Sequence, residues 1–350
     1  MTNYIILAFC IIILLSYIFD ITGKYTKVPG VVLLIALGIL LHLLTDSIGL
    51  KIPNLKPLLP VIGTLGLILI IMEASFDLSI SRDKKALIPG SVSSALILLF
   101  LTVSILSISL IVLVKAPVKD AILNSIPLSI ISSAVAIASA GTLKSRDREF
   151  VIYESSFSDI FGIILFDYIL LSKGTFFNGL LSFTLSTILT LIIAIAVTAI
   201  LAILLHKTKH HVNYVIILTA VILVYIIAKM VHLPALLLVL SFGLILSNNQ
   251  FLQKTPVVKF VDFGKFRNDL ASFKTILTEM TFLVRSFFFL VFGFYIKIDG
   301  LLDPLNLLFA ITIIVFVFGF RFLFFLLVLK KKPVPLVFFS PRGLITILLF

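Results

Sequence analysis

Long apolar blocks run through this 350-residue sequence and restrict its possible folds more than any other feature. Blocks such as 61–71 and 96–114 are separated by short charged stretches. A helix of about 20 apolar residues crosses the hydrocarbon core of a bilayer, and many blocks approach that length. Only 13% of the residues are charged and 61% are apolar, whereas roughly a quarter of the residues in soluble domains are charged. Because strand-like alternation is missing as well, the sequence predicts an all-α polytopic membrane protein and argues against a β-barrel.

Charged residues, prolines and glycines divide the chain into twelve candidate membrane spans, and we treat residues 1–350 as one transmembrane unit. The polar segment 250–274 is predicted to be an interfacial linker between the two halves. The predicted spans are 3–19, 29–45, 58–75, 86–114, 121–142, 150–172, 179–205, 212–229, 233–249, 275–296, 304–329 and 333–350.

The lysines and arginines between these spans predict the orientation in the membrane. The odd-numbered loops hold 18 of them and the even-numbered loops hold 7. Because basic loops stay in the cytoplasm, we expect the N-terminus to face outward, in a plasma membrane of the bacterial inner-membrane type. This distribution also explains the net charge of +12 without nucleic acid as a partner. The last span ends at Phe350 without a closing basic loop, so we expect a thirteenth helix to follow.

The sixth span holds the densest set of polar residues. Asp159 lies eleven residues from the basic loop at Arg148, which places it about 16 Å deep, near the middle of the bilayer. Ser155, one turn earlier, and the adjacent Ser158 share a helical face with it, because the three residues have the spacing i, i+3, i+4. Since an ionisable residue at this depth is costly, Asp159 is the first candidate for an ion-binding group.

Glu154 points to a different side of the same helix, and its partner can be sought by depth. Arg321 lies nine residues before Lys330, in the cytoplasmic half of the eleventh span. An ion pair between Glu154 and Arg321 cancels two costly charges and leaves Asp159 as the titratable acid. A purely structural role stays open for the pair and also for Asp159.

Two spans carry breaks near the midplane. The fifth contains Ser132 and Ser133, and the twelfth contains the sequence Ser-Pro-Arg-Gly at 340–343. Transporters use discontinuous helices to expose helix ends to an ion, and one break in each half is typical of inverted repeats. Arg342 can offset the negative ends of two half-helices there. A simple packing kink is the alternative.

Three further charged residues inside predicted spans are secondary candidates. Glu73 lies in the third span and Arg285, with Glu279, in the tenth. We interpret these as structural or gating residues, with ion binding as the alternative. Asp167 lies toward the outer end of the sixth span, where it could line an extracellular funnel.

Five short motifs, in order along the chain, resemble the sodium/proton exchanger branch of the monovalent cation:proton antiporters. The segment 154–159 is similar to the family's Glu-Ser-x-x-Asn-Asp, with serine at the asparagine position. The other four motifs are 27–34, 72–76, 318–321 and 341–343.

This resemblance implies thirteen helices, a homodimer, and a dimerisation domain interleaved with a core that contains two crossing broken helices. It implies that the core moves to give alternating access, and that Asp159 binds either a cation or a proton. Ser155 and Ser158 then supply neighbouring oxygen ligands, Ser132 and Ser133 lie at the crossing, and Glu154 with Arg321 forms a structural bridge. No cofactor is implied beyond the transported ions.

One departure from the family pattern leaves the cation open. Ser132-Ser133-Ala134 stands where the family carries Thr-Asp-Pro, and a Ser-Ser crossing resembles the potassium-efflux branch. The family suggests Na⁺, but carboxylate and hydroxyl oxygens also suit Li⁺ and K⁺. A channel-like cation pathway and organic-anion transport are further alternatives. An intramembrane enzyme is not expected, because the sequence has no His-Glu-x-x-His or Gly-x-Ser-x-Gly motif.

Overall fold

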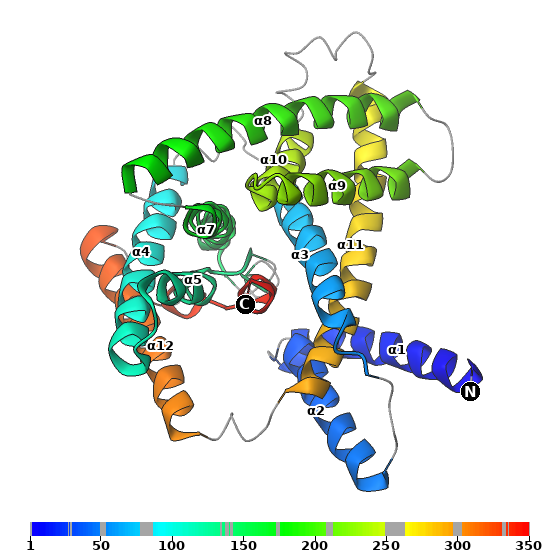
Figure 1. Ribbon diagram of the computed structural model, residues 1–350, viewed down its shortest axis with the longest axis horizontal. Helices are drawn as coiled ribbons and strands as arrows, with labels where there is room; N and C mark the ends of the chain where they lie inside the picture. Colours follow the sequence, from blue (N-terminus) through cyan, green and yellow to red (C-terminus); the bar gives the residue numbers. More distant parts are fainter. Residues whose placement is uncertain are drawn as a thin grey trace. The chain divides into compact units, whose positions relative to one another are not determined.

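In the computed structural model all regular secondary structure of the described residues is helical, with no strand among them (Figure 1). The described residues are 2–26, 28, 30–49, 54–77, 87–133, 135–136, 140, 143–172, 176–207, 213–248, 263–296, 303–330, 334, 336–338 and 339–349. Ala134 of the fifth span and residues 250–262 of the predicted linker lie outside them.

Each of the twelve predicted ranges contains a helical segment, which confirms the predicted all-α polytopic class. The segments are α1 (Thr2–Thr26), α2 (Gly30–Ile48), α3 (Leu58–Asp77), α4 (Ile88–Val114), α5 (Val118–Ser129), α7 (Ser145–Leu171), α8 (Phe176–Lys207), α9 (Asn213–Met230), α10 (Ala235–Ser247), α11 (Phe263–Tyr295), α12 (Pro304–Leu323) with a π-helical continuation (Phe324–Val328), and a 3₁₀ turn (Leu336–Phe338) followed by α13 (Leu344–Leu348).

Six of the described helices are long and apolar enough by themselves to cross a membrane. They include α4 and α8, while α9 and α10 are shorter apolar helices. Helix α7 does not qualify, because it carries the acidic residues of the predicted site. Apolar side chains such as Leu14, Val112 and Leu327 are more than half exposed. Exposed apolar surface of this extent is expected where helices face lipid.

The chain divides into two compact units. The first comprises residues 1–69 and 278–311, where α1 packs against α2. In this unit the Leu55 amide donates to the Tyr295 hydroxyl over 2.7 Å. The second unit comprises residues 70–277 and 312–350, and it contains Asp159 together with both predicted breaks.

Within the second unit, α7 is the central helix. Seen nearly end-on in Figure 1, it contacts α4, α5, α8 and α10. The short α13 packs against α5, so the two broken spans meet although they are about 200 residues apart in the sequence. A cluster of buried apolar residues, including Phe150, Phe325 and Leu336, covers the beginning of α7.

Helix α11 begins at Phe263, twelve residues before the predicted tenth span. Residues 263–274 of the predicted linker are therefore a continuous part of this helix. Lys265, Arg267 and Asp269 made the segment look like a linker, but lysine and arginine are good helix formers. The charged residues therefore mark the end of the apolar segment, whereas the helix itself begins further toward the N-terminus, at Phe263.

Candidate functional site

Helix α5 ends in the middle of its predicted span, at Ser129. Pro127 lies inside its last turn, where a proline removes one backbone hydrogen bond and clashes with the preceding turn. Ile130 then adopts an extended conformation, with φ −69° and ψ 133°. The chain continues through Ser132 and turns helical again at Ser133, and both serines are buried.

The twelfth span is broken in a corresponding way between Phe338 and Leu344. Residues before a proline avoid helical geometry, so Pro341 keeps this stretch open. The two breaks touch directly, because the Ser132 amide donates to the Pro341 carbonyl over 3.0 Å. A Cβ atom at Gly343 would collide with the Ser132 side chain. Glycine at position 343 is therefore what permits the crossing.

Arg342 joins the two breaks through its guanidinium group. Its Nε donates to the Leu128 carbonyl over 2.6 Å, and an Nη atom donates to the Ser340 hydroxyl over 2.8 Å. Leu128 lies in the last turn of α5, where carbonyls lack partners within the helix. The Thr346 hydroxyl satisfies the neighbouring Pro127 carbonyl over 2.9 Å. A positive charge thus lies at the C-terminal end of the first half-helix.

Asp159 of α7 faces the break of the fifth span. Its side chain is 2% exposed, and its Oδ2 accepts a hydrogen bond from the Ser133 amide over 3.2 Å. The Ser133 side chain also hydrogen-bonds to this carboxyl. Among the described residues, Oδ1 has no hydrogen-bond partner and no basic side chain pairs with Asp159. A buried carboxylate in this position needs a bound proton or cation to neutralise it.

Ser155 and Ser158 lie beside Asp159 on α7 and are fully buried, but both hydroxyls have backbone partners. Ser155 Oγ donates to the carbonyls of Val151 and Ile152, over 2.8 and 3.1 Å. Ser158 Oγ accepts the Ile131 amide over 2.9 Å. The Ser158 hydroxyl therefore attaches the break to α7, while the Ser155 hydroxyl donates to carbonyls of its own helix.

The structure brings Glu154 and Arg321 together. Two Nη atoms of Arg321 donate to the two carboxylate oxygens of Glu154, each over 2.9 Å. The side chains are 0% and 1% exposed. Ser94 of α4 also donates to Glu154, and Arg321 donates to the Leu336 carbonyl over 3.0 Å. The pair therefore links α4, α7, α12 and the first half of the twelfth span.

The secondary candidates lie in different surroundings. Arg285 belongs to the first unit, where it pairs with Asp20 at 3.6 Å. Glu73 is half-buried near the end of α3. Asp167, expected near an extracellular funnel, is instead buried, with 4% of its side chain exposed. It accepts a hydrogen bond from the backbone of Leu237, in the first turn of α10.

The sequence did not single out several residues of the site. Ser156 and Ser75 line a small cavity together with Asp159, and Ser94 contacts Glu154. A helical projection places both Ser155 and Ser156 close to Asp159, so it does not indicate which of them faces the cavity. Ser75 and Ser94 lie on other helices, so spacing along α7 does not indicate them, although Ser75 falls within the motif 72–76.

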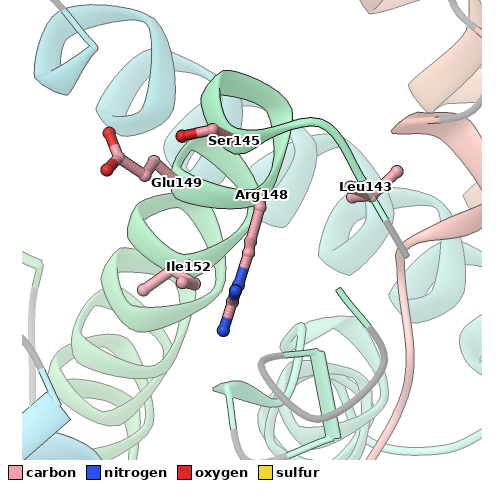
Figure 2. A pocket seen from close by; sticks show the side chains of 5 residues that line it. All are labelled: Leu143, Ser145, Arg148, Glu149 and Ile152. Carbon is pink, nitrogen blue, oxygen red and sulfur yellow. The ribbon is translucent and has the colours of Figure 1, made fainter. Parts of the chain in front are cut away.

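A larger hollow of about 480 Å³ lies at the beginning of α7. Leu143, Ser145, Arg148, Glu149 and Ile152 line it (Figure 2). Figure 2 shows the Arg148 guanidinium extending from one side of α7 and the Glu149 carboxylate from another. Glu149 precedes Asp159 by ten residues, so the hollow is about 15 Å along the helix from that acid.

Two crossing broken segments beside a buried acid define the class of this protein as a polytopic membrane protein with a transporter-type core. The family model for the sodium/hydrogen exchanger, transmembrane, matches residues 10–344. The chain belongs to this family, as its five motifs predicted.

Solved structures show the same fold. The chain is similar to the sodium proton antiporter MjNhaP1 from Methanocaldococcus jannaschii at pH 8, with a TM-score of 0.73 and 19% identity over 98% of this chain and 86% of that chain. An electron-microscopy structure of the same antiporter has a TM-score of 0.70 and 18% identity, and covers 100% of this chain and 84% of the other. No curated protein matches the chain in sequence.

Proposed function

We propose that this protein is a secondary active antiporter that exchanges a monovalent cation for protons, and that both ions bind at Asp159. The observation that carries this proposal is the position of Asp159, buried between α7 and a broken span with one oxygen unpartnered among the described residues. Membership of the sodium/hydrogen exchanger family supports it. The fold shared with the sodium proton antiporter MjNhaP1 supports it further.

Exchange follows from competition at one carboxylate. The ionised carboxylate is too costly to move through the membrane uncompensated, so the core changes its accessible side only when Asp159 holds a cation or a proton. One ion carried inward therefore requires the other to be carried outward. The crossing lets the two broken spans move together in this step, because hydrogen bonds such as that from the Ser132 amide to the Pro341 carbonyl join them.

The simplest stoichiometry is one cation for one proton. Such exchange does not respond to the membrane potential, and a pH difference of one unit supports a tenfold cation gradient, about 1.4 kcal/mol. If Asp167 or Glu73 also changes protonation during the cycle, exchange becomes electrogenic. Flux through reconstituted protein with the potential clamped separates the two cases, since voltage-dependent turnover contradicts the one-carboxylate scheme.

The basic loops favour an outward N-terminus and, with it, a cytoplasmic position for the hollow at Arg148, which we propose as the cation's entrance. Localisation in a bacterial-type inner membrane and assembly as a homodimer stay predictions.

A potassium-efflux type of antiporter is the second candidate, and the Ser132-Ser133 crossing is the observation that favours it. A channel-like cation pathway is less well supported, because channels need a continuous hydrated path. The cavity beside Asp159 has a volume of only about 10 Å³.

Proton flux in vesicles tests the proposal. The protein is reconstituted with an internal acid and a pH-sensitive dye, and Na⁺, Li⁺ or K⁺ is added outside. We expect at least one of these cations to collapse the pH gradient in a saturable way, and Asp159→Asn to remove the response while the protein remains monodisperse. Full flux through Asp159→Asn contradicts the assignment of Asp159.

A further inference from the structure

Two polar atoms on the same side of α7 are buried without a hydrogen-bond partner among the described residues. They are Asp159 Oδ1 and Ser156 Oγ. Residues three apart on a helix are neighbours on its surface, so these two atoms can bind the same ligand. Buried polar atoms in native proteins nearly always have partners, and an unsatisfied pair side by side points to a ligand.

Both residues line one small cavity. Its volume is about 10 Å³, close to the smallest space that holds one water molecule. Ser75 of α3 supplies a third polar side chain. The apolar part of its wall is formed mainly by Ile160, Leu240 and Leu244.

Ser75 is held in place by its surroundings. Its hydroxyl donates to the Met72 carbonyl over 2.6 Å, so the lone pairs of its oxygen remain available to a cation. A Cβ atom at Gly243 of α10 would collide with the Ser75 hydroxyl. Close packing of α10 on α3 therefore fixes the position of this oxygen.

The hydroxyls of the two serines that the family motif emphasises are used differently. Ser155 donates to carbonyls of its own helix, and Ser158 accepts the Ile131 amide. Ser156 is the serine next to Asp159 on α7 whose hydroxyl has no such partner among the described residues. Ser156 also lines the cavity beside Asp159, whereas Ser155 and Ser158 are not among its lining residues.

We propose that Ser156 and Ser75 are cation ligands, which hold a dehydrated ion against Asp159 Oδ1, and that this cavity selects Na⁺ and Li⁺ over K⁺. Hard cations prefer oxygen ligands, and carboxylate and hydroxyl oxygens supply them here. The larger K⁺ fits only if Leu240 and Leu244 move apart. Displacing side chains in a close-packed interior costs free energy, so K⁺ binds more weakly. This inference rests on the proposed exchange at Asp159 and specifies its cation and its ligands.

The half-saturating concentrations of Na⁺, Li⁺ and K⁺ for proton flux test the inference in reconstituted vesicles. We expect Ser156→Ala to raise the half-saturating Na⁺ concentration about tenfold, with a smaller effect on the maximal rate, because one ligand is lost. Ser156→Thr keeps the hydroxyl and restores Na⁺ affinity to within about threefold. Ser125→Ala is the matched control, since the buried Ser125 hydroxyl donates only to the Ala121 carbonyl of its own helix. Leu240→Ala widens the cavity, so we expect it to lower the half-saturating K⁺ concentration relative to that of Na⁺.

The outcomes distinguish this inference from the proposed function. If Asp159→Asn is inactive but Ser156→Ala matches the wild type while Ser155→Ala weakens Na⁺, antiport at Asp159 stands and the proposed ligands are wrong. A wild-type protein that transports K⁺ better than Na⁺ overturns the proposed selectivity. Exchange that survives Asp159→Asn overturns the proposed function itself.

Discussion

The buried pair of Glu154 and Arg321 gives a quantitative prediction. In Glu154→Gln the guanidinium of Arg321 keeps its charge but loses the carboxylate that accepts its two 2.9 Å hydrogen bonds. Removing one partner of a buried ion pair costs about 3–5 kcal/mol. At about 1.4 kcal/mol per tenfold change, the unfolding constant rises by between two and four orders of magnitude. Ser94→Ala removes a single hydrogen bond to the same carboxylate and serves as a milder variant, at about 1.5–3 kcal/mol.

Reversible unfolding in mixed micelles, followed by circular dichroism, measures these differences. A double-mutant cycle with Arg321→Gln isolates the pair, and we expect the double variant to be less destabilised than the sum of the single variants by about 2 kcal/mol or more. The folded double variant should still exchange ions, because Asp159 is intact. If Glu154→Gln unfolds within 1 kcal/mol of the wild type, the pair does not hold the four segments together and the reasoning is refuted.

Three further predictions follow from the site. Gly343→Ala should abolish exchange in vesicles and lower thermal stability, because its Cβ atom collides with Ser132; wild-type flux contradicts the close crossing. Asp167→Ala should destabilise the protein by about 1 kcal/mol, because the carboxyl caps Leu237 in the first turn of α10, whereas Asp167→Asn keeps an acceptor and should unfold like the wild type. Arg148→Glu should lower the half-saturating cation concentration at low ionic strength and not at high salt, since it reverses a charge at the hollow; a salt-independent effect contradicts the assigned entrance.

Helix content could be predicted because the bilayer imposes simple rules on the length of apolar segments. Apolar blocks marked the spans, while the midplane depth of Asp159, counted from Arg148, stays a prediction. The same counting put Arg321 at the level of Glu154, although 167 residues separate them, and the two are in contact. Proline and glycine marked both breaks, because backbone geometry is a local property of the sequence.

These rules do not predict which way a side chain points or which helices it contacts. A helix projection puts Ser155 and Ser156 on either side of Asp159, and only the packing of α3 and α10 decides which faces the cavity. Asp20 was overlooked because it lies just beyond the predicted first span, yet α1 continues to Thr26 and Asp20 pairs with Arg285. The partner of a buried charge depends on which other helices pack beside it, and the local sequence does not specify that packing.

Calorimetric titration of the purified protein with Na⁺ in two buffers of different ionisation enthalpy tests competition at Asp159 most directly. The slope of the apparent enthalpy against buffer enthalpy gives the number of protons released per cation bound. We predict about one proton released per Na⁺ in the wild type, weaker Na⁺ binding as the pH falls, and no Na⁺ binding in Asp159→Asn. Na⁺ binding that releases no proton, or that persists in Asp159→Asn, contradicts exchange at a single shared carboxylate.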